Sequence, residues 1–180
     1  FEGSVLNGKN ERPVVWNFDN ALNNTAVLDG FTLKNGSSAN GGAMYNGGSS
    51  PTLSNLWIKA NTATADGGAI YNVNSSSPVM TNITIEGNTA NYGGGIFNRN
   101  SSSPVMTNVI IKNNTANNDG GAMYNDVSAS PQLTNVSITG NTAQNGAGMY
   151  NRTNSAPVLV NTLIADNTAV TNGGAIRNQA

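Results

Sequence analysis

A six-residue block occurs six times along this chain, and successive copies begin 26 or 27 residues apart. The first copy, Gly-Gly-Ala-Met-Tyr-Asn, spans residues 41–46, and the others differ from it by few substitutions. Prolines and an Asn-Thr-Ala triplet return with the same period. The prolines are Pro51, Pro78, Pro104, Pro131 and Pro157, and the triplets begin at Asn61, Asn88, Asn114, Asn141 and Asn167. A fixed period of this length indicates a solenoid, in which each repeat is one coil stacked on the next.

The segment between each proline and the next triplet has the pattern of a β-strand. Apolar and polar residues alternate over its second half, as in Ile83, Thr84 and Ile85. Three apolar columns recur from coil to coil: Leu53/Met80/Met106/Leu133/Leu159, Leu56/Ile83/Val109/Val136/Thr162 and Ile58/Ile85/Ile111/Ile138/Ile164. The chain has neither the runs of helix formers that helical repeats need nor the Leu-x-x-Leu-x-Leu frame of leucine-rich repeats. It therefore predicts parallel coils stacked about 4.8 Å apart.

Further strands are expected in each coil. The Ala-Met-Tyr-Asn part of the block predicts a second strand, and a short third strand is expected near the Pro-Val segments. Residues 1–40 resemble a divergent first coil, and residues 41–180 are regular repeats of the same single domain. The coil that begins at Gly173 is incomplete at Ala180. We therefore expect a segment of a longer protein, whose open C-terminal end is covered by further coils or by another chain.

Two columns of asparagine are predicted to form ladders at corners, where each amide bonds to the coils above and below and tolerates a left-handed backbone. The first column is Asn55, Asn82, Asn108, Asn135 and Asn161, and the second is Asn61, Asn88, Asn114, Asn141 and Asn167. The paired glycines predict another tight corner. Two charge columns, Lys59/Glu86/Lys112 and Arg99/Asp126/Arg152, place opposite charges one coil apart, as an in-register stack favours.

These motifs resemble those of a known family. Gly-Gly-Ala-[Ile/Met] together with Ile-x-x-Asn, as in Ile85 to Asn88 and Ile111 to Asn114, is similar to the paired repeat motifs of polymorphic outer membrane proteins. It resembles still more the related Ser-Pro-x-x-x-Asn-x-x-Ile repeats of large bacterial surface proteins. The resemblance covers about residues 26–180. It implies a right-handed β-helix, secretion, display at a bacterial cell surface or outer membrane, and often adhesion, and it carries over no catalytic residue.

The composition excludes several kinds of partner, metal site and catalytic nucleophile. The net charge is −1 and only 9% of residues are charged, without a basic run, so nucleic acid and anionic membrane are not expected partners. No apolar stretch approaches the roughly 18 residues that span a bilayer. The chain has no Cys and no His, which excludes thiolate and imidazole metal sites and Ser-His or Cys-His nucleophiles. We expect no cofactor and no metal.

One column is aromatic, and it is the candidate binding site. Its members are Tyr45, Tyr71, Phe97, Tyr124 and Tyr150, followed by Arg177. If the preceding Met or Ile faces inward, alternation turns these rings outward into a stripe suited to sugar faces or a partner protein. With the opposite parity the rings form a core or corner stack instead, and both roles can coexist.

Two other functions compete with binding. Asp66 and Asp119 share one repeat position two coils apart, with Tyr92 between them, which predicts a separation on the order of 10 Å. These carboxylates are the candidates for a polysaccharide-acting hydrolase or lyase, although the inverting-glycosidase range is about 6.5–9.5 Å. The column Thr62/Thr89/Thr115/Thr142/Thr168 invites an ice-binding interpretation, but its neighbours are Asn and Ala at an expected corner.

The sequence therefore predicts an all-β fold, a single-stranded right-handed parallel β-helix of about six coils of 26–27 residues. We expect a non-enzymatic, secreted or cell-surface segment that acts as an adhesin or structural spacer. It would present its side-chain ladders to a glycan or a surface protein, through many weak and repeated contacts.

Overall fold

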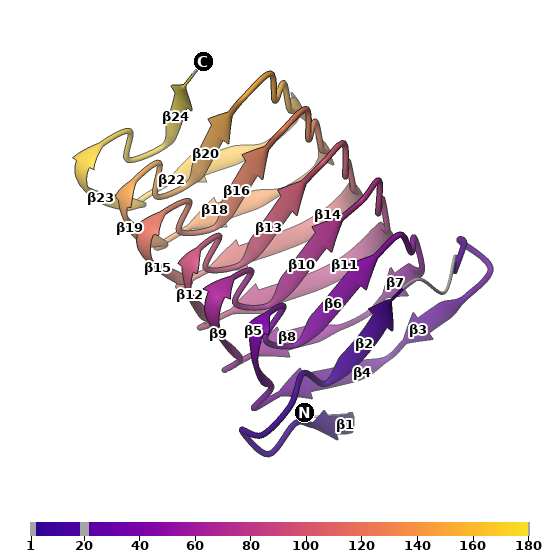
Figure 1. Cartoon of the computed structure of the whole chain (residues 1–180). Helices are drawn as coiled ribbons and strands as arrows, with labels where there is room; N and C mark the ends of the chain where they lie inside the picture. Colours follow the sequence, from indigo (N-terminus) through magenta and orange to yellow (C-terminus); the bar gives the residue numbers. More distant parts are fainter. Residues whose placement is uncertain (1–2, 19–21, 180) are drawn as a thin grey trace.

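The computed structural model describes residues 3–18 and 22–179, so residues 1–2, 19–21 and 180 of the predicted domain lie outside the described part. All 24 elements of that part are β-strands. They stack as successive coils, with the two ends of the chain at opposite ends of the stack (Figure 1). Every strand pairing is parallel, which confirms the predicted all-β solenoid.

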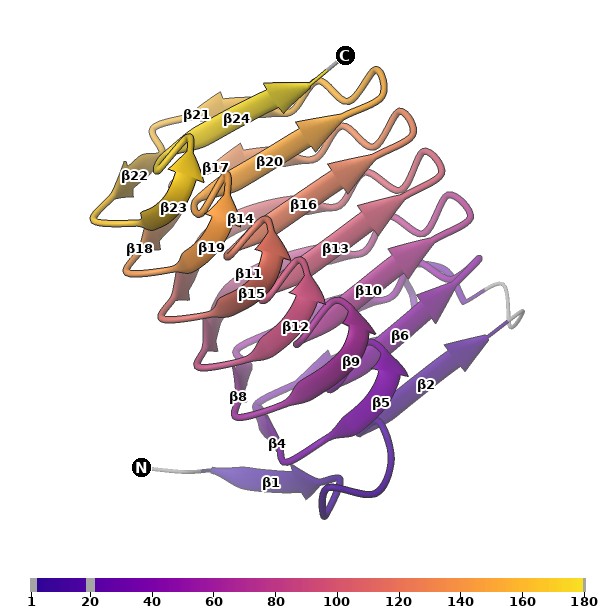
Figure 2. The ribbon, with the colours of Figure 1, turned by 60° about the vertical axis from the view of Figure 1, so that its left-hand side comes forward.

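The strands form three sheets, and each sheet runs the length of the stack (Figure 2). Sheet A has eleven strands: β1 Ser4–Asn7, β3 Val27–Asp29, β4 Phe31–Lys34, β7 Thr52–Ser54, β8 Trp57–Lys59, β11 Val79–Glu86, β14 Val105–Lys112, β17 Gln132–Thr134, β18 Ser137–Thr139, β21 Val158–Val160 and β22 Leu163–Ala165. Sheet B has seven strands: β2 Val15–Phe18, β6 Met44–Gly47, β10 Ile70–Val73, β13 Ile96–Arg99, β16 Met123–Asp126, β20 Met149–Arg152 and β24 Ile176–Gln179. Sheet C has six strands: β5 Ser37–Asn40, β9 Thr62–Asp66, β12 Thr89–Tyr92, β15 Thr115–Asp119, β19 Thr142–Asn145 and β23 Thr168–Asn172.

The number of turns is about seven, because β2 in the divergent N-terminal region adds a strand to sheet B. Its residues Val15, Trp16 and Asn17 pair in register with Met44, Tyr45 and Asn46 of the first block. Residues 1–40 also contribute β1, β3, β4 and β5, and β1 pairs with β4 inside the same region. This region therefore makes more than the single coil that was expected from its sequence.

The short strand expected near the Pro-Val segments is present in several coils, as in β7, β17 and β21, but it does not form the third sheet. Val79 and Val105 begin β11 and β14, so the Pro-Val segments belong to sheet A together with the isoleucine column. The third sheet, sheet C, instead begins at the threonine of each Asn-Thr-Ala triplet, such as Thr62. The residue before each triplet has a positive φ, for example Ala60 at 52°, and this left-handed turn directs the chain into a new sheet.

Left-handed asparagines explain why the apolar columns of sheet A are spaced three and then two residues apart. Asn55, Asn82, Asn108, Asn135 and Asn161 have φ values between 47° and 56°. In the second coil, Leu53 and Leu56 are both buried, and Ser54 and Asn55 between them both lie on the outer side. One left-handed residue thus shifts the alternation by one position and keeps both apolar columns in the core.

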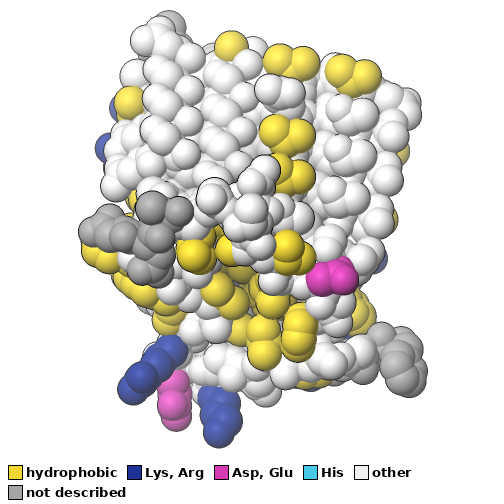
Figure 3. Space-filling model, turned by 90° about the vertical axis from the view of Figure 1, so that its right-hand side faces the viewer, with side chains coloured by type: hydrophobic (Ala, Val, Ile, Leu, Met, Phe, Trp, Pro, Cys, Tyr) yellow, Lys and Arg dark blue, Asp and Glu magenta, His cyan; other side chains and the backbone are white. Residues whose placement is uncertain are grey.

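The core is one continuous apolar cluster enclosed by the three sheets. The predicted apolar columns supply it together with the Met/Ile position of the block, including Met44, Ile70, Ile96, Met123 and Met149. The coils at the two ends are less well covered, with Val5, Trp16, Phe18 and Val27 exposed at one end and Val158, Val160, Leu163 and Ile176 exposed at the other. Figure 3 shows hydrophobic side chains crowded toward the N-terminal end, below coils whose surface is mostly uncharged and polar.

Asparagine side chains hold the coils in register inside the core. The column from Asn61 to Asn141 is buried, and each amide nitrogen donates to the amide oxygen of the next coil at 2.9–3.0 Å. The same nitrogens also donate to backbone carbonyls of other coils, as Asn88 does to Ile58 at 3.0 Å. This predicted ladder is confirmed, and its burial makes each bond costly to lose.

Removing one buried rung should destabilise the fold far more than removing an exposed one. Asn88→Ala deletes the acceptor of the Asn61 backbone and side-chain amides and removes one donor to the Ile58 carbonyl. We expect a loss of about 3 kcal/mol in the free energy of unfolding, measured by chemical denaturation. The matched control is Asn82→Gly, which removes an exposed rung and keeps the left-handed backbone, and it should cost no more than about 1 kcal/mol. Equal losses in the two variants would contradict this assignment.

Candidate functional site

The aromatic column lies on the outer side of sheet B as one continuous stack. The Met/Ile before each ring points into the core, so of the two parities that the sequence left open the structure has the one that turns the rings outward. Ring centroids from Tyr45 through Tyr150 are 4.9–5.4 Å apart, and the planes are within 24° of parallel. Trp16 extends the stack below Tyr45 at 4.3 Å, and the guanidinium of Arg177 lies 5.5 Å from the Tyr150 ring. The sequence analysis did not assign Trp16 to this stack.

Although these rings point away from the core, they are largely shielded from solvent. Tyr71, Phe97, Tyr124 and Tyr150 are only 3–7% exposed. Each ring face is covered by the ring of the next coil, and the Gly-Gly corner between sheets C and B lies against the base of each side chain. A Cβ added at Gly120, for example, would lie 2.8 Å from Cβ of Tyr124. A sugar therefore has no free ring face between Tyr71 and Tyr150, and a ligand can reach only ring edges and hydroxyl groups.

A hollow of about 430 Å³ lies over the edges of these rings. One side is formed by the last residues of the sheet C strands and the other by the residues that follow the aromatic column in sheet B. Its lining comprises Asp66, Tyr92, Asp119, Phe97, Tyr124, Tyr150, Arg99, Asp126, Arg152 and Gln179. The structure thus brings together three sets of residues that the sequence singled out separately: the aromatic column, one charge column and the Asp66/Asp119 pair.

Charge is concentrated in this hollow. Nine charged residues follow Asn61 in the sequence, and five of them, three Asp and two Arg, line the hollow. A structural β-helix has no need of ionisable groups at one place, because its coils are held by backbone ladders, amides and apolar packing. The cluster is therefore the strongest indication of a functional site in the described residues.

The arginines lie near hydroxyl groups and one carboxylate. Nε of Arg99 lies 3.7 Å from Oδ2 of Asp126 in the next coil, as the charge column predicted. The guanidinium of Arg99 acts to lower the pKa of the Tyr71 hydroxyl, and that of Arg152 acts to lower the pKa of the Tyr124 hydroxyl. Burial raises the pKa of Tyr124 to about 12, although its bond to Arg152 acts in the opposite sense. Burial outweighs this effect, so both phenols stay neutral at physiological pH, and the two guanidinium groups line the same hollow.

The two candidate carboxylates differ in their surroundings. Tyr92 pairs with Asp66 on one side and with Asp119 on the other, so the predicted separation of two coils is confirmed. Oδ1 of Asp119 accepts a hydrogen bond of 2.8 Å from Asn145. Burial raises the pKa of Asp66, an effect that Arg99 partly offsets and Asp126 reinforces. Within the described residues, no group of three or more Asp, Glu, His or Cys side chains could hold a metal ion.

A family model for the right-handed β-helix region matches residues 17–176. The chain belongs to the right-handed β-helix family. The matched region includes the charged residues of the hollow and the aromatic column from Tyr45 to Tyr150. Comparisons with curated proteins and with solved structures returned no match.

The exposed asparagine column of this β-helix lies away from the hollow. Asn55, Asn82, Asn108, Asn135 and Asn161 form the other predicted ladder, with amide bonds of 2.7–3.3 Å between successive coils. They lie at the bend within sheet A rather than at a corner between sheets. Their left-handed backbone was predicted, and it is the reason that asparagine occupies this position in every regular coil.

A third asparagine ladder was not predicted. It runs inside sheet B through Asn17, Asn46, Asn72, Asn98, Asn125, Asn151 and Asn178, with amide bonds of 2.8–2.9 Å. The signal was present in the sequence, because every block ends in Asn. Alternation places that Asn on the same side as the buried Met or Ile, where an amide needs a partner in the neighbouring coil.

The threonine column is not at a corner, contrary to expectation. Thr62, Thr89, Thr115, Thr142 and Thr168 begin the strands of sheet C and face outward, since the following Ala points inward. The next outward column begins with Thr64 and continues with Asn91, Asn117 and Gln144. The outer side of sheet C therefore carries one threonine column and lacks the second that the ice-binding interpretation requires.

The described residues contain no apolar helix long enough to cross a bilayer.

The unusual pKa of Asp66 predicts a pH-dependent effect on stability. Burial raises this pKa above 3.8, so the folded state favours protonated Asp66. The stabilisation of the fold by that protonation is fully present below pH 3.8 and is lost as pH rises through the folded-state pKa. Asp66→Asn should therefore raise the thermal unfolding midpoint relative to wild type at pH 7, and the gain should vanish below pH 3.8.

Asp29 provides a control of opposite sign. Hydrogen bonds from Ser54 and Asn55 lower its pKa, so ionised Asp29 stabilises the fold above pH 3.8. This stabilisation is lost as the pH falls through the folded-state pKa. Asp29→Asn should lower the midpoint at pH 7. Thermal melts of both variants across this pH range would contradict the assignment if the two shifts had the same sign.

Proposed function

We propose that this chain is a non-enzymatic binding and spacer segment of a secreted or cell-surface protein, and that it binds a glycan or a partner protein through the hollow over the aromatic stack. The observation that carries the proposal is the clustering of Asp66, Arg99, Asp119, Asp126 and Arg152 in that hollow, in a chain otherwise poor in charge.

The arrangement of the hollow favours binding without moving parts. The aromatic residues supply a rigid floor, since each ring is stacked on its neighbours and packs against the glycine corner. Two arginines and three carboxylates are spaced by whole coils along it. Such a site presents both charges in a fixed order to a ligand that lies along the solenoid, and its affinity comes from several polar contacts made together.

A location outside the cell is supported by the repeat motifs. Gly-Gly-Ala-[Ile/Met] and Ile-x-x-Asn resemble the repeats of polymorphic outer membrane proteins and of large bacterial surface proteins, which implies secretion, surface display and adhesion. Membership of the right-handed β-helix family agrees with that resemblance at the level of the fold. Low net charge and the mixed charges of the hollow favour neither nucleic acid nor membrane insertion.

An enzyme that acts on polysaccharides is the second candidate. The observation in its favour is that Asp66 and Asp119 line the same hollow, and that burial raises the pKa of Asp66 in the direction a general acid needs. Their separation of two coils, on the order of 10 Å, is slightly larger than the range of inverting glycosidases, about 6.5–9.5 Å. We therefore favour binding over hydrolysis.

The arginines provide the test of binding. A glycan array probed with wild type should identify a ligand, and Arg99→Gln combined with Arg152→Gln should weaken its binding at least about tenfold, because the fixed guanidinium donors are lost. Lys112→Gln is the matched control, since it also removes one partner of an exposed inter-coil ion pair, at 3.5 Å from Glu86 on sheet A. Equal binding by all three proteins would rule out the hollow as the binding site.

The carboxylates provide the test of catalysis. Wild type and an Asp66→Asn, Asp119→Asn double variant are incubated with a panel of polysaccharides, and new reducing ends and unsaturated products are measured. We expect neither protein to release products. Cleavage by wild type that disappears in the double variant would establish the enzymatic function instead.

A further inference from the structure

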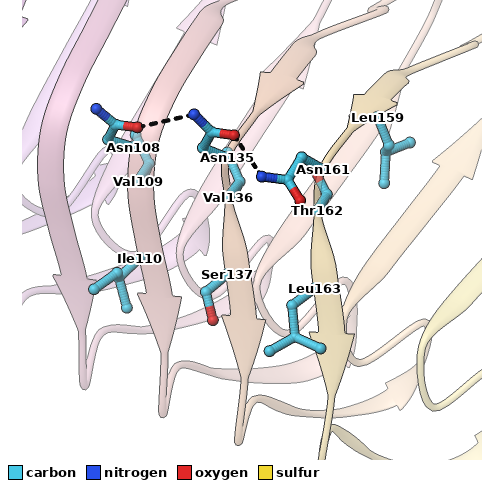
Figure 4. Close-up of a pocket in the computed structure, with 10 residues that line it drawn as sticks. All are labelled: Asn108, Val109, Ile110, Asn135, Val136, Ser137, Leu159, Asn161, Thr162 and Leu163. Atoms are coloured by element: carbon cyan, nitrogen blue, oxygen red, sulfur yellow. Dashed lines mark hydrogen bonds between the residues drawn. The ribbon is translucent and has the colours of Figure 1, made fainter.

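The bend in sheet A creates a second hollow, on a different part of the surface from the charged one. It has a volume of about 790 Å³ and is lined by Asn108, Val109, Ile110, Asn135, Val136, Ser137, Leu159, Asn161, Thr162 and Leu163. None of these residues is charged. Figure 4 shows three amides in one row, with Ile110, Ser137 and Leu163 in a second row beside them. We call these two rows, continued along sheet A, the amide track.

The amides of the track have hydrogen-bonding capacity to spare. A side-chain amide has two N–H donors and an oxygen with two lone pairs. The ladder uses one donor and one lone pair of each residue, as in the bonds from Asn135 to Asn108 and from Asn161 to Asn135. All the amides in this row are exposed. Each inner coil therefore offers one free donor and one free acceptor, held in place by its neighbours and repeated about every 4.8 Å.

The second row offers apolar contacts at the same interval. It consists of Trp57, Thr84, Ile110, Ser137 and Leu163, which pair in register across five strands. Ile110 is 43% exposed and Leu163 is 57% exposed, on the outer side of a sheet where polar residues are the rule. Apolar and hydroxyl side chains thus alternate along the row.

A ligand that matches the track is uncharged, extended and periodic at one unit per coil, with hydroxyl groups on one side and a C–H surface on another. An extended peptide repeats about every 3.3 Å and falls out of register with the coils. A sugar unit in an extended polysaccharide is about as long as the coil spacing, and its ring has both hydroxyl and apolar C–H surfaces.

We propose that the amide track binds a neutral, linear polysaccharide that lies along the solenoid axis with one sugar unit per coil. The amides bond to its hydroxyl groups, and Ile110 and Leu163 contact its ring faces. This site shares no residue with the charged hollow, so either site can fail without the other.

The experiment titrates the full chain with cello- and chito-oligosaccharides from dimer to hexamer by calorimetry, with hyaluronan as the acidic comparison. Affinity should increase with each added sugar, and hyaluronan should bind more weakly than the neutral hexamer. An Ile110→Thr, Leu163→Ser variant should lose at least about fivefold in affinity for the hexamer. Asn135→Asp, which keeps the left-handed backbone but replaces the free amide donor by a charge, should lose at least as much.

The matched control is Val105→Thr on the same strand as Ile110. Val105 is also exposed and also stands where another coil has Thr, at Thr52, but it does not line the hollow. The affinity of the Val105→Thr variant for the neutral hexamer should stay within about twofold of that of wild type. The proposal is overturned if no neutral oligosaccharide binds, if affinity does not depend on length, or if the track variants bind as wild type does. It is also overturned if the Arg99→Gln, Arg152→Gln variant abolishes binding of the neutral hexamer, because the charged hollow would then be its site.

Discussion

The hydrogen bond between buried asparagine amides of adjacent coils is the interaction on which this structure depends. A coil of 26 or 27 residues has too little apolar surface to fold alone, so its stability comes from its neighbours. Backbone ladders would tolerate a slip between coils, but a buried amide with a single matching partner does not. The rungs at Asn61 to Asn141 and at Asn46 to Asn125 therefore fix the register of all three sheets. The aromatic stack, the charge columns and both candidate sites follow from that register.

Much of the fold could be predicted from the sequence because each coil repeats the same pattern of residues. The period, the strand of the isoleucine column, the strand of the aromatic block, the left-handed asparagines and the glycine corner were all visible as columns. The position of the third sheet was not. A Thr-Ala-x segment has no strong strand pattern, and its structure depends on the left-handed turn at positions such as Ala60, which sequence alone does not reveal.

The candidate site was only partly predictable for a related reason. Its residues were each recognised, but as separate columns, since the sequence does not show the angle at which sheet C meets sheet B. That angle brings Asp66 and Asp119 over the aromatic edges and covers the outward-facing rings, whose exposure the sequence had left open. A one-dimensional repeat predicts which residues are neighbours along the axis, but it does not predict which columns meet across a corner.

The direction of the amide bonds has a consequence for the molecule as a whole. In both buried ladders, the amide nitrogen donates toward the C-terminal coil, as Asn61 does to Asn88 and Asn72 does to Asn98. In the exposed ladder it donates toward the N-terminal coil, as Asn108 does to Asn82. Each row is a line of aligned dipoles, comparable to those of an α-helix, but the inner and outer rows point in opposite directions. Because two of these rows are buried and one is exposed, the outer row offsets only part of the axial dipole that the inner rows build up as coils are added.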